Sequence, residues 1–227
     1  SLYTGEMRQQ KPSVFVMHGF GSQKFPDGST FEGEFRDGVA VNFGIYTYAN
    51  GRQYHGKYVN GKREDSNGIL LSSQGDIEYQ GSWKNGRKDG EGMEIMNAAG
   101  ENYKGLFKND VREGLGIYRM ADNSYYKGIW HENTLGGKAV YKTSDGKVYK
   151  GLFKNYQITQ GTLKWVDGRI YEGQFRGLKQ NGAGYQEWPN GDRYEGEWKD
   201  GQMHGKGALT DAHGNKREGT WKFDQFQ

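Results

Sequence analysis

The sequence predicts an all-β fold, an elongated single-layer antiparallel sheet of tandem β-hairpin repeats arranged as a solenoid-like rod. Three observations predict it. Among 227 residues, 38 are glycine, 15% are aromatic and only 3 are proline. An aromatic residue followed two positions later by glycine recurs about every 23 residues, a period typical of repeat architectures. Asn-Gly and Asp-Gly dipeptides, which favour tight hairpin turns, fall between these pairs.

The repeat runs along the whole chain. We therefore expect one array over residues 1–227. Its units start near Tyr3, Phe31, Tyr54, Tyr79, Tyr103, Tyr126, Tyr149, Tyr171 and Tyr194, with a partial unit at Arg217. A second aromatic residue usually follows four positions after the first, and a Gly-x-Gly sequence follows the next turn. Two turns per unit leave two short strands between them.

Side chains alternate between the two faces of a strand, so each unit has two chemically different faces. Tyr194, Gly196 and Trp198 share one face, which we call the aromatic face, and Glu195 and Glu197 point to the opposite, charged face. A helix is excluded because each interior glycine costs about 1 kcal/mol of helix stability. Glycine between two aromatic residues leaves room for a ring to lie against the backbone.

The composition limits the kind of core and the kinds of function. Hydrophobic residues make up only 33% of the chain, but the net charge is only +3, and Tyr and Trp can replace aliphatic residues as the source of burial. With no cysteine, disulfides and thiolate metal sites are excluded. No apolar run reaches the ~20 residues of a membrane span. The chain opens on Ser1 without an initiator Met, so we expect a piece of a longer protein.

The segment Tyr194–Gly207, YEGEWKDGQMHGKG, resembles the core of a membrane occupation and recognition nexus (MORN) repeat. Tyr79–Gly100 and Tyr103–Gly116 match the same pattern. Several units depart from it: Asn42 and Ala139 stand where the pattern has glycine, and the unit at Tyr149 is one residue short and keeps only one glycine of its Gly-x-Gly. The resemblance implies a cytoskeletal or ciliary scaffold that binds helices or dimerises, or a targeting region attached to a larger enzyme.

The aromatic face is the candidate binding surface, because a single-layer sheet cannot bury both of its faces by itself. We expect a partner helix or extended peptide to lie along it. The residues predicted to contact this partner are Tyr103, Phe107, Tyr126, Trp130, Tyr149, Phe153, Tyr171, Phe175, Trp188, Tyr194 and Trp198. The alternative is that these rings stack on neighbouring repeats and form the only core of the fold. A homodimer is a second type of assembly that this face and the sheet edges allow.

An alternative function is a membrane-targeting module that binds anionic phospholipids. Its candidate residues are Lys62, Arg63, Lys84, Arg87 and Lys88. Lipid-binding segments usually carry four to eight clustered Lys and Arg residues, whereas these are mixed with acidic residues, as in ordinary solvated loops. Nucleic-acid binding is not expected, because basic residues do not gather on one segment.

No catalytic residues, metal ligands or cofactor sites are predicted. The five histidines do not lie at metal-ligand spacing, and Gly-x-Gly here opens a strand, not the helix of a dinucleotide fold. The function predicted from the sequence is a non-catalytic protein-interaction scaffold, located in the cytoplasm at the cytoskeleton or cilium.

Overall fold

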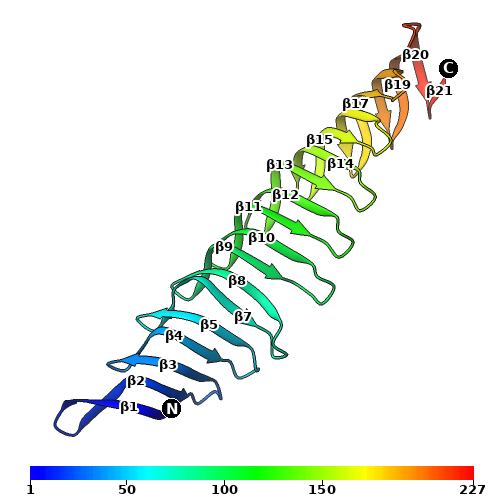
Figure 1. Cartoon of the computed structure of the whole chain (residues 1–227). Helices are drawn as coiled ribbons and strands as arrows, with labels where there is room; N and C mark the ends of the chain where they lie inside the picture. The colour runs from blue at the N-terminus through cyan, green and yellow to red at the C-terminus, as the bar shows by residue number, and fades with distance from the viewer. The chain divides into compact units, whose positions relative to one another are not determined.

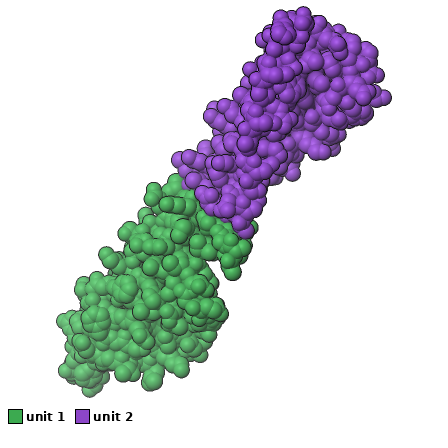
Figure 2. All heavy atoms as spheres, turned by 45° about the vertical axis from the view of Figure 1, so that its right-hand side comes forward, with its two compact units in different colours: residues 1–113 green, residues 114–227 purple.

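The computed structural model describes residues 1–227 and contains strands and turns but no helix. The chain forms two compact units, residues 1–113 and 114–227 (Figure 2), and each is described by itself. Strands that follow one another in the chain pair antiparallel as successive hairpins (Figure 1). The predicted all-β fold of tandem antiparallel hairpins is therefore confirmed.

The first unit contains the strands β1 to β10. Their bounds are β1 Leu2–Lys11, β2 Val14–Lys24, β3 Thr30–Arg36, β4 Val39–Thr47, β5 Gln53–Val59, β6 Lys62–Arg63, β7 Asp65–Leu71, β8 Ile77–Lys84, β9 Arg87–Ile95 and β10 Asn102–Lys108. The short β6 and the following β7 both pair with β5 and together form one return strand.

The strand β11 contains the boundary between the two units, and the remaining strands belong to the second unit. Their bounds are β11 Val111–Arg119, β12 Tyr125–His131, β13 Thr134–Lys142, β14 Val148–Lys154, β15 Gln157–Lys164, β16 Ile170–Arg176, β17 Lys179–Glu187, β18 Arg193–Lys199, β19 Gln202–Thr210, β20 Lys216–Lys222 and β21 Gln225–Phe226.

The strand register places glycine opposite glycine across neighbouring strands. In the second unit one such row runs Gly116, Gly128, Ala139, Gly151, Gly161, Gly173, Gly184, Gly196, Gly207 and Gly219, with alanine at one position only. This row forms a strip of bare backbone across the aromatic face. A ring can therefore approach the sheet more closely than any side chain would allow.

The tyrosine that opens most units lies flat on two glycines of this row. A Cβ atom built on Gly207 would lie 2.1 Å from the hydroxyl oxygen of Tyr194, and one built on Gly196 would lie 2.6 Å from it. The Tyr194 hydroxyl donates a hydrogen bond to the carbonyl oxygen of Glu197 at 3.2 Å. Its equivalent Tyr171 does the same to Gln174 at 2.8 Å. Each ring is thus buried and its hydroxyl is satisfied by the backbone.

The aromatic residue four positions later stands edge-on to these tyrosines and joins one repeat to the next. The Trp198 ring contacts Tyr194 of its own repeat at 5.2 Å and Tyr171 of the preceding repeat at 5.4 Å, both in T-shaped geometry. The same alternation continues from Tyr194 to Trp221. The indole of Trp198 also donates to the carbonyl oxygen of Gly184 at 3.1 Å. Aromatic edge-to-face contacts therefore supply the core that aliphatic residues supply elsewhere.

The two turns of each repeat differ, and only one matches the prediction in full. At Asn60-Gly61 both residues have positive φ, 50° and 74°, as a two-residue type I′ hairpin requires. At Asn50-Gly51 only the glycine has positive φ, 84°. The Asn50 side chain instead accepts a hydrogen bond from the backbone N–H of Arg52 at 3.2 Å. Asparagine therefore contributes through its side chain at the second turn and through its backbone at the first.

We predict that Gly207→Ala destabilises the protein, because its methyl group would overlap the Tyr194 ring, and overpacking of this kind costs about 1–3 kcal/mol. The matched control is Gly136→Ala, also within a strand, where the nearest atom to the new Cβ would lie 3.9 Å away. Urea unfolding of both variants checks this. Equal midpoints for the two variants would contradict the flat seating of the tyrosine.

Candidate functional site: the aromatic face

Nine of the eleven residues predicted to contact a partner are buried inside the sheet layer. They are Tyr103, Phe107, Trp130, Tyr149, Phe153, Tyr171, Phe175, Tyr194 and Trp198. These rings fill the core through the ladder described above, as the alternative interpretation of the sequence expected. Tyr126 and Trp188 are half-buried and keep part of their surface open. The surface that a partner can touch is therefore narrower than the sequence suggested.

In the repeat that contains Tyr126, the opening tyrosine does not lie flat on two glycines of the row. The Ala139 methyl and the Leu135 side chain occupy the space above Gly128, where a Cβ would lie 2.7 and 3.0 Å from them. The Tyr126 ring instead stacks face to face on Tyr141, with centroids 4.3 Å apart and planes 14° from parallel. Tyr141 in turn stacks on Tyr149 at 5.9 Å. The result is a tyrosine stack (Tyr126, Tyr141 and Tyr149) whose rings do not pack flat on the glycine row.

Two members of the tyrosine stack, Tyr126 and Tyr141, are half-buried. Burial, followed by the neighbouring Tyr141 and Tyr156 hydroxyls, raises the pKa of Tyr126 to about 12. The Tyr126 hydroxyl therefore remains a neutral donor near neutral pH. The Tyr149 hydroxyl donates to the carbonyl oxygen of Leu178 at 3.2 Å rather than to its own strand.

Further along the same face, Trp188 borders an apolar hollow. Its other lining residues include Pro189, Met203 and Leu209. Trp165 follows β15 as Trp188 follows β17, and it is also half-buried. The Arg169 guanidinium lies 4.8 Å from the Trp165 ring centroid. The second unit thus presents Tyr141, Trp165 and Trp188 as a row of partly exposed rings outside the buried ladder.

In the first unit the aromatic face carries cations above its rings instead. Arg63 lies 4.4 Å from the Trp83 ring centroid, Lys88 4.8 Å from Tyr79 and Arg112 5.1 Å from Tyr103. The three cations occupy the same position of the return strand in three consecutive repeats. In the second unit this position holds Leu135 and Ile158. Cation–π contact replaces aliphatic packing at this position.

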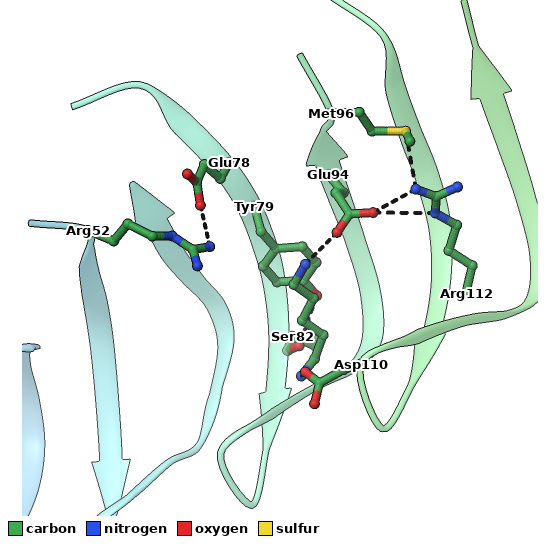
Figure 3. Close-up of polar contacts among 9 residues, drawn as sticks. Arg52, Glu78, Tyr79, Ser82, Glu94, Met96, Asp110 and Arg112 are labelled. Carbon is green, nitrogen blue, oxygen red and sulfur yellow. Dashed lines mark hydrogen bonds and ion pairs between the residues drawn. The ribbon is translucent and has the colours of Figure 1, made fainter. Parts of the chain in front are cut away.

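One carboxylate joins two of these cations (Figure 3). Glu94 contacts Lys88 Nζ at 2.5 Å and Arg112 Nη2 at 2.9 Å, and the Arg112 guanidinium also approaches the Met96 sulfur at 3.1 Å. Arg52, immediately before β5, and Glu78 of β8 form a further ion pair. Burial raises the pKa of Glu94, but the hydrogen bonds and charges of Lys88 and Arg112 outweigh it and hold the pKa below its ordinary value.

The residues proposed for lipid binding divide into two groups. Arg63 donates to the Tyr48 hydroxyl and to the carbonyl oxygen of Gly86, both at 2.6 Å, and Lys88 is paired with Glu94. These two side chains make contacts within the protein that the sequence does not indicate. Lys62, Lys84 and Arg87 are exposed. Lipid binding through these three cations remains a prediction.

Two features of the molecule do not follow from the repeat pattern. Tyr141 was not among the predicted contact residues, although the exceptional Ala139 two positions earlier was the signal for its displaced stack. The face expected to be charged also carries Leu115, Ile129 and Leu152, which are 66%, 53% and 45% exposed.

No group of three or more His, Cys, Asp and Glu side chains is arranged to hold a metal ion. The structure contains no helix with the length and apolar character needed to cross a membrane.

We predict that Glu94→Gln lowers stability at neutral pH by about 1–3 kcal/mol, because Lys88 and Arg112 lose their charged partner. A carboxyl whose pKa is lowered on folding stabilises the protein above its unfolded pKa, and this contribution is lost as the pH falls through the folded pKa. The difference between wild type and variant should therefore vanish in acid. Urea unfolding across this pH range measures it, with the exposed Glu91→Gln as control. A difference that persists in acid would contradict the ion-pair account.

Solved structures with a similar arrangement of strands include the TCP10 domain of Danio rerio CPAP in complex with a peptide of Danio rerio STIL. It is 14% identical, with a TM-score of 0.49 over 89% of this chain and 95% of that chain. The Drosophila melanogaster SAS-4 (dCPAP) TCP domain in complex with a proline-rich motif of Ana2 (dSTIL) is 13% identical. Its TM-score is 0.37 over 94% of this chain and 97% of that chain. No curated protein matches the chain.

The family model of the MORN repeat matches seven stretches of the sequence. They are residues 16–30, 31–51, 79–96, 103–125, 126–148, 171–193 and 194–216. Together they cover more than half of the chain and follow the period of the hairpins. The chain therefore belongs to the MORN repeat family.

Proposed function

We propose that this protein is a non-catalytic interaction scaffold that holds a helix or an extended peptide of a partner protein along the aromatic face of its second unit. The observation that carries the proposal is the tyrosine stack. The other repeat-opening tyrosines of this unit are buried by their own neighbours, but Tyr126 and Tyr141 stand off the glycine row with part of each ring open.

Partly exposed tyrosine and tryptophan are well suited to binding. They offer large contact areas at low cost in side-chain entropy, and they are enriched among the residues that dominate interface energies. The Tyr126 hydroxyl adds a hydrogen-bond donor, and its raised pKa keeps it protonated at neutral pH. The hollow beside Trp188, with Met203 and Leu209, provides a place for an apolar anchor.

The spacing of these rings limits the length of the bound segment. Tyr141 lies on β13 and Trp188 follows β17, so four strand spacings separate them, or about 19 Å. A helix of about 13 residues covers that length at 1.5 Å per residue. An extended peptide covers it with about six residues.

The cellular location is part of the proposal and rests on the MORN family alone. We expect the protein in the cytoplasm at the cytoskeleton or cilium, either by itself or as the targeting region of a longer chain. Imaging of a fluorescent fusion in the source cells tests this. A homodimer would itself cover aromatic surface, and sedimentation of the purified chain measures that directly.

The partner can be captured by a photo-crosslinking amino acid placed at Tyr141, and its crosslinked segment then made as a peptide for titration against the purified chain. We predict that Trp188→Ala and Tyr141→Ala each weaken binding about 30-fold, because loss of a central aromatic anchor costs about 2 kcal/mol or more. The control is Phe20→Ala, which removes a 68% exposed ring from the opposite face.

Thermal unfolding of each variant must show that the fold is retained. Wild-type affinity in both folded variants would remove the aromatic face as the binding site. Flotation of the chain with phosphoinositide vesicles at physiological salt, lost on Lys62→Glu/Lys84→Glu substitution, would instead assign the function to membrane targeting.

A further inference from the structure

The charged face of the second unit carries a surface that differs from the rest of that face. We call it the lysine–aliphatic patch: Leu115, Lys127, Ile129, Lys138, Lys150 and Leu152. These residues lie on four neighbouring strands, β11 to β14, and all are exposed. At the corresponding strand position of later repeats the chain has Glu172, Glu195 and Glu218 in place of Lys127 and Lys150.

The register arranges the patch in two rows across the strands. In the first row Lys127 and Lys150 both lie opposite Val140, so the two lysines stand two strand spacings apart, or about 9.6 Å. The second row pairs Leu115 with Ile129 and Lys138 with Leu152. Positive charge and exposed aliphatic surface therefore run side by side.

The position of Ile129 normally holds a polar side chain that completes the fold. In two later repeats the equivalent Gln174 and Glu197 fold over the bulge glycine of the next strand and accept a hydrogen bond from the following backbone N–H, both at 3.2 Å. Ile129 has no atom that can accept such a bond. Folding alone would favour a polar residue here.

Without that covering side chain the bulge is open. A Cβ built on Gly137 would meet no atom within 4 Å, whereas one on the equivalent Gly205 would lie 2.5 Å from Glu197. A hollow lined in part by Ile129, Leu135, Gly136 and Phe153 occupies the space. It adjoins the exposed Ile129 side chain and extends toward His131 and Glu132, at the end of the same strand.

The lysines of the patch have no acidic partner in the protein. Lys127, Lys138 and Lys150 form no ion pair, and neither do the nearby Lys142, Lys154 and Lys164. In the last repeat, Glu218 stands at the position of Lys127 and Lys150 and pairs with Lys216 at 2.6 Å. The patch therefore presents uncompensated positive charge to an acidic ligand.

We propose that the lysine–aliphatic patch binds an acidic amphipathic helix of a protein partner, at a site separate from the aromatic face. Acidic residues seven positions apart on a helix lie about 10.5 Å apart, close to the separation of Lys127 and Lys150. Apolar residues three and four positions after each acid lie on the same helix face and would contact Ile129, Leu152 and the hollow. A flat lipid surface supplies charge but no side chain to fill the hollow.

The test uses the full chain and a fluorescein-labelled helical peptide of three heptads, each Glu-Ala-Gln-Leu-Leu-Gln-Ala. A peptide of the same composition with its acids moved to one end is the control ligand. Binding is followed by anisotropy at low salt and at ~0.15 M salt. We expect the heptad peptide to bind the wild-type chain. The double substitution Lys127→Glu/Lys150→Glu should lower the affinity at least tenfold, whereas Lys199→Glu/Lys206→Glu should change it by no more than about twofold.

A second variant separates binding from folding. Ile129→Gln supplies the hydrogen-bond acceptor found in later repeats, so it should keep or raise the melting temperature. The same substitution should lower the affinity for the peptide about tenfold. The proposal is overturned by no binding at about 100 µM peptide, by equal binding of the rearranged peptide, or by equal losses in the two charge-reversal variants. Flotation with phosphatidylserine vesicles that depends on Lys127 and Lys150, without peptide binding, would assign the patch to a membrane instead.

Discussion

The seating of a tyrosine ring on two facing glycines is the constraint from which the rest of the fold follows. It requires glycine opposite glycine on neighbouring strands, which fixes the strand register. It buries Tyr194 and lets Trp198 stand between two such rings, so that each repeat is held to the next by edge-to-face contacts. A thin sheet with few aliphatic residues can in this way exclude water from one face.

The surfaces that we assign to binding lie where this constraint is relaxed. One methyl group, on Ala139, together with Leu135 closes the space above Gly128 and turns the tyrosines outward into a stack. On the opposite face, Ile129 replaces a polar side chain that would cover the bulge, and a hollow is left open. In both cases the repeat gives up a local packing or hydrogen-bonding contact, and partner contact would recover it.

The periodicity of the sequence predicted the hairpins, their antiparallel order and the aromatic face, because glycine spacing and turn dipeptides act locally. It could not decide whether Tyr194 and Trp198 face a partner or each other, since that depends on how closely a ring approaches the backbone of the next strand. The internal roles of Arg63 and Lys88 were also hidden, because a lysine or arginine beside a turn normally points to solvent. Only contacts between repeats show that these cations lie over Trp83 and Tyr79.

Spectrophotometric titration of the tyrosines, together with circular dichroism, tests the central claim most directly. Burial raises the pKa of Tyr103 and of Tyr194 to about 12. A group whose pKa is raised on folding stabilises the protein below its unfolded pKa, which is about 10 for tyrosine, and this contribution is lost as the pH rises through the folded pKa. We predict two steps of phenolate absorbance, the first near pH 10 from exposed tyrosines and the second together with loss of the β-sheet signal. A single step near pH 10 with the sheet intact would contradict the account.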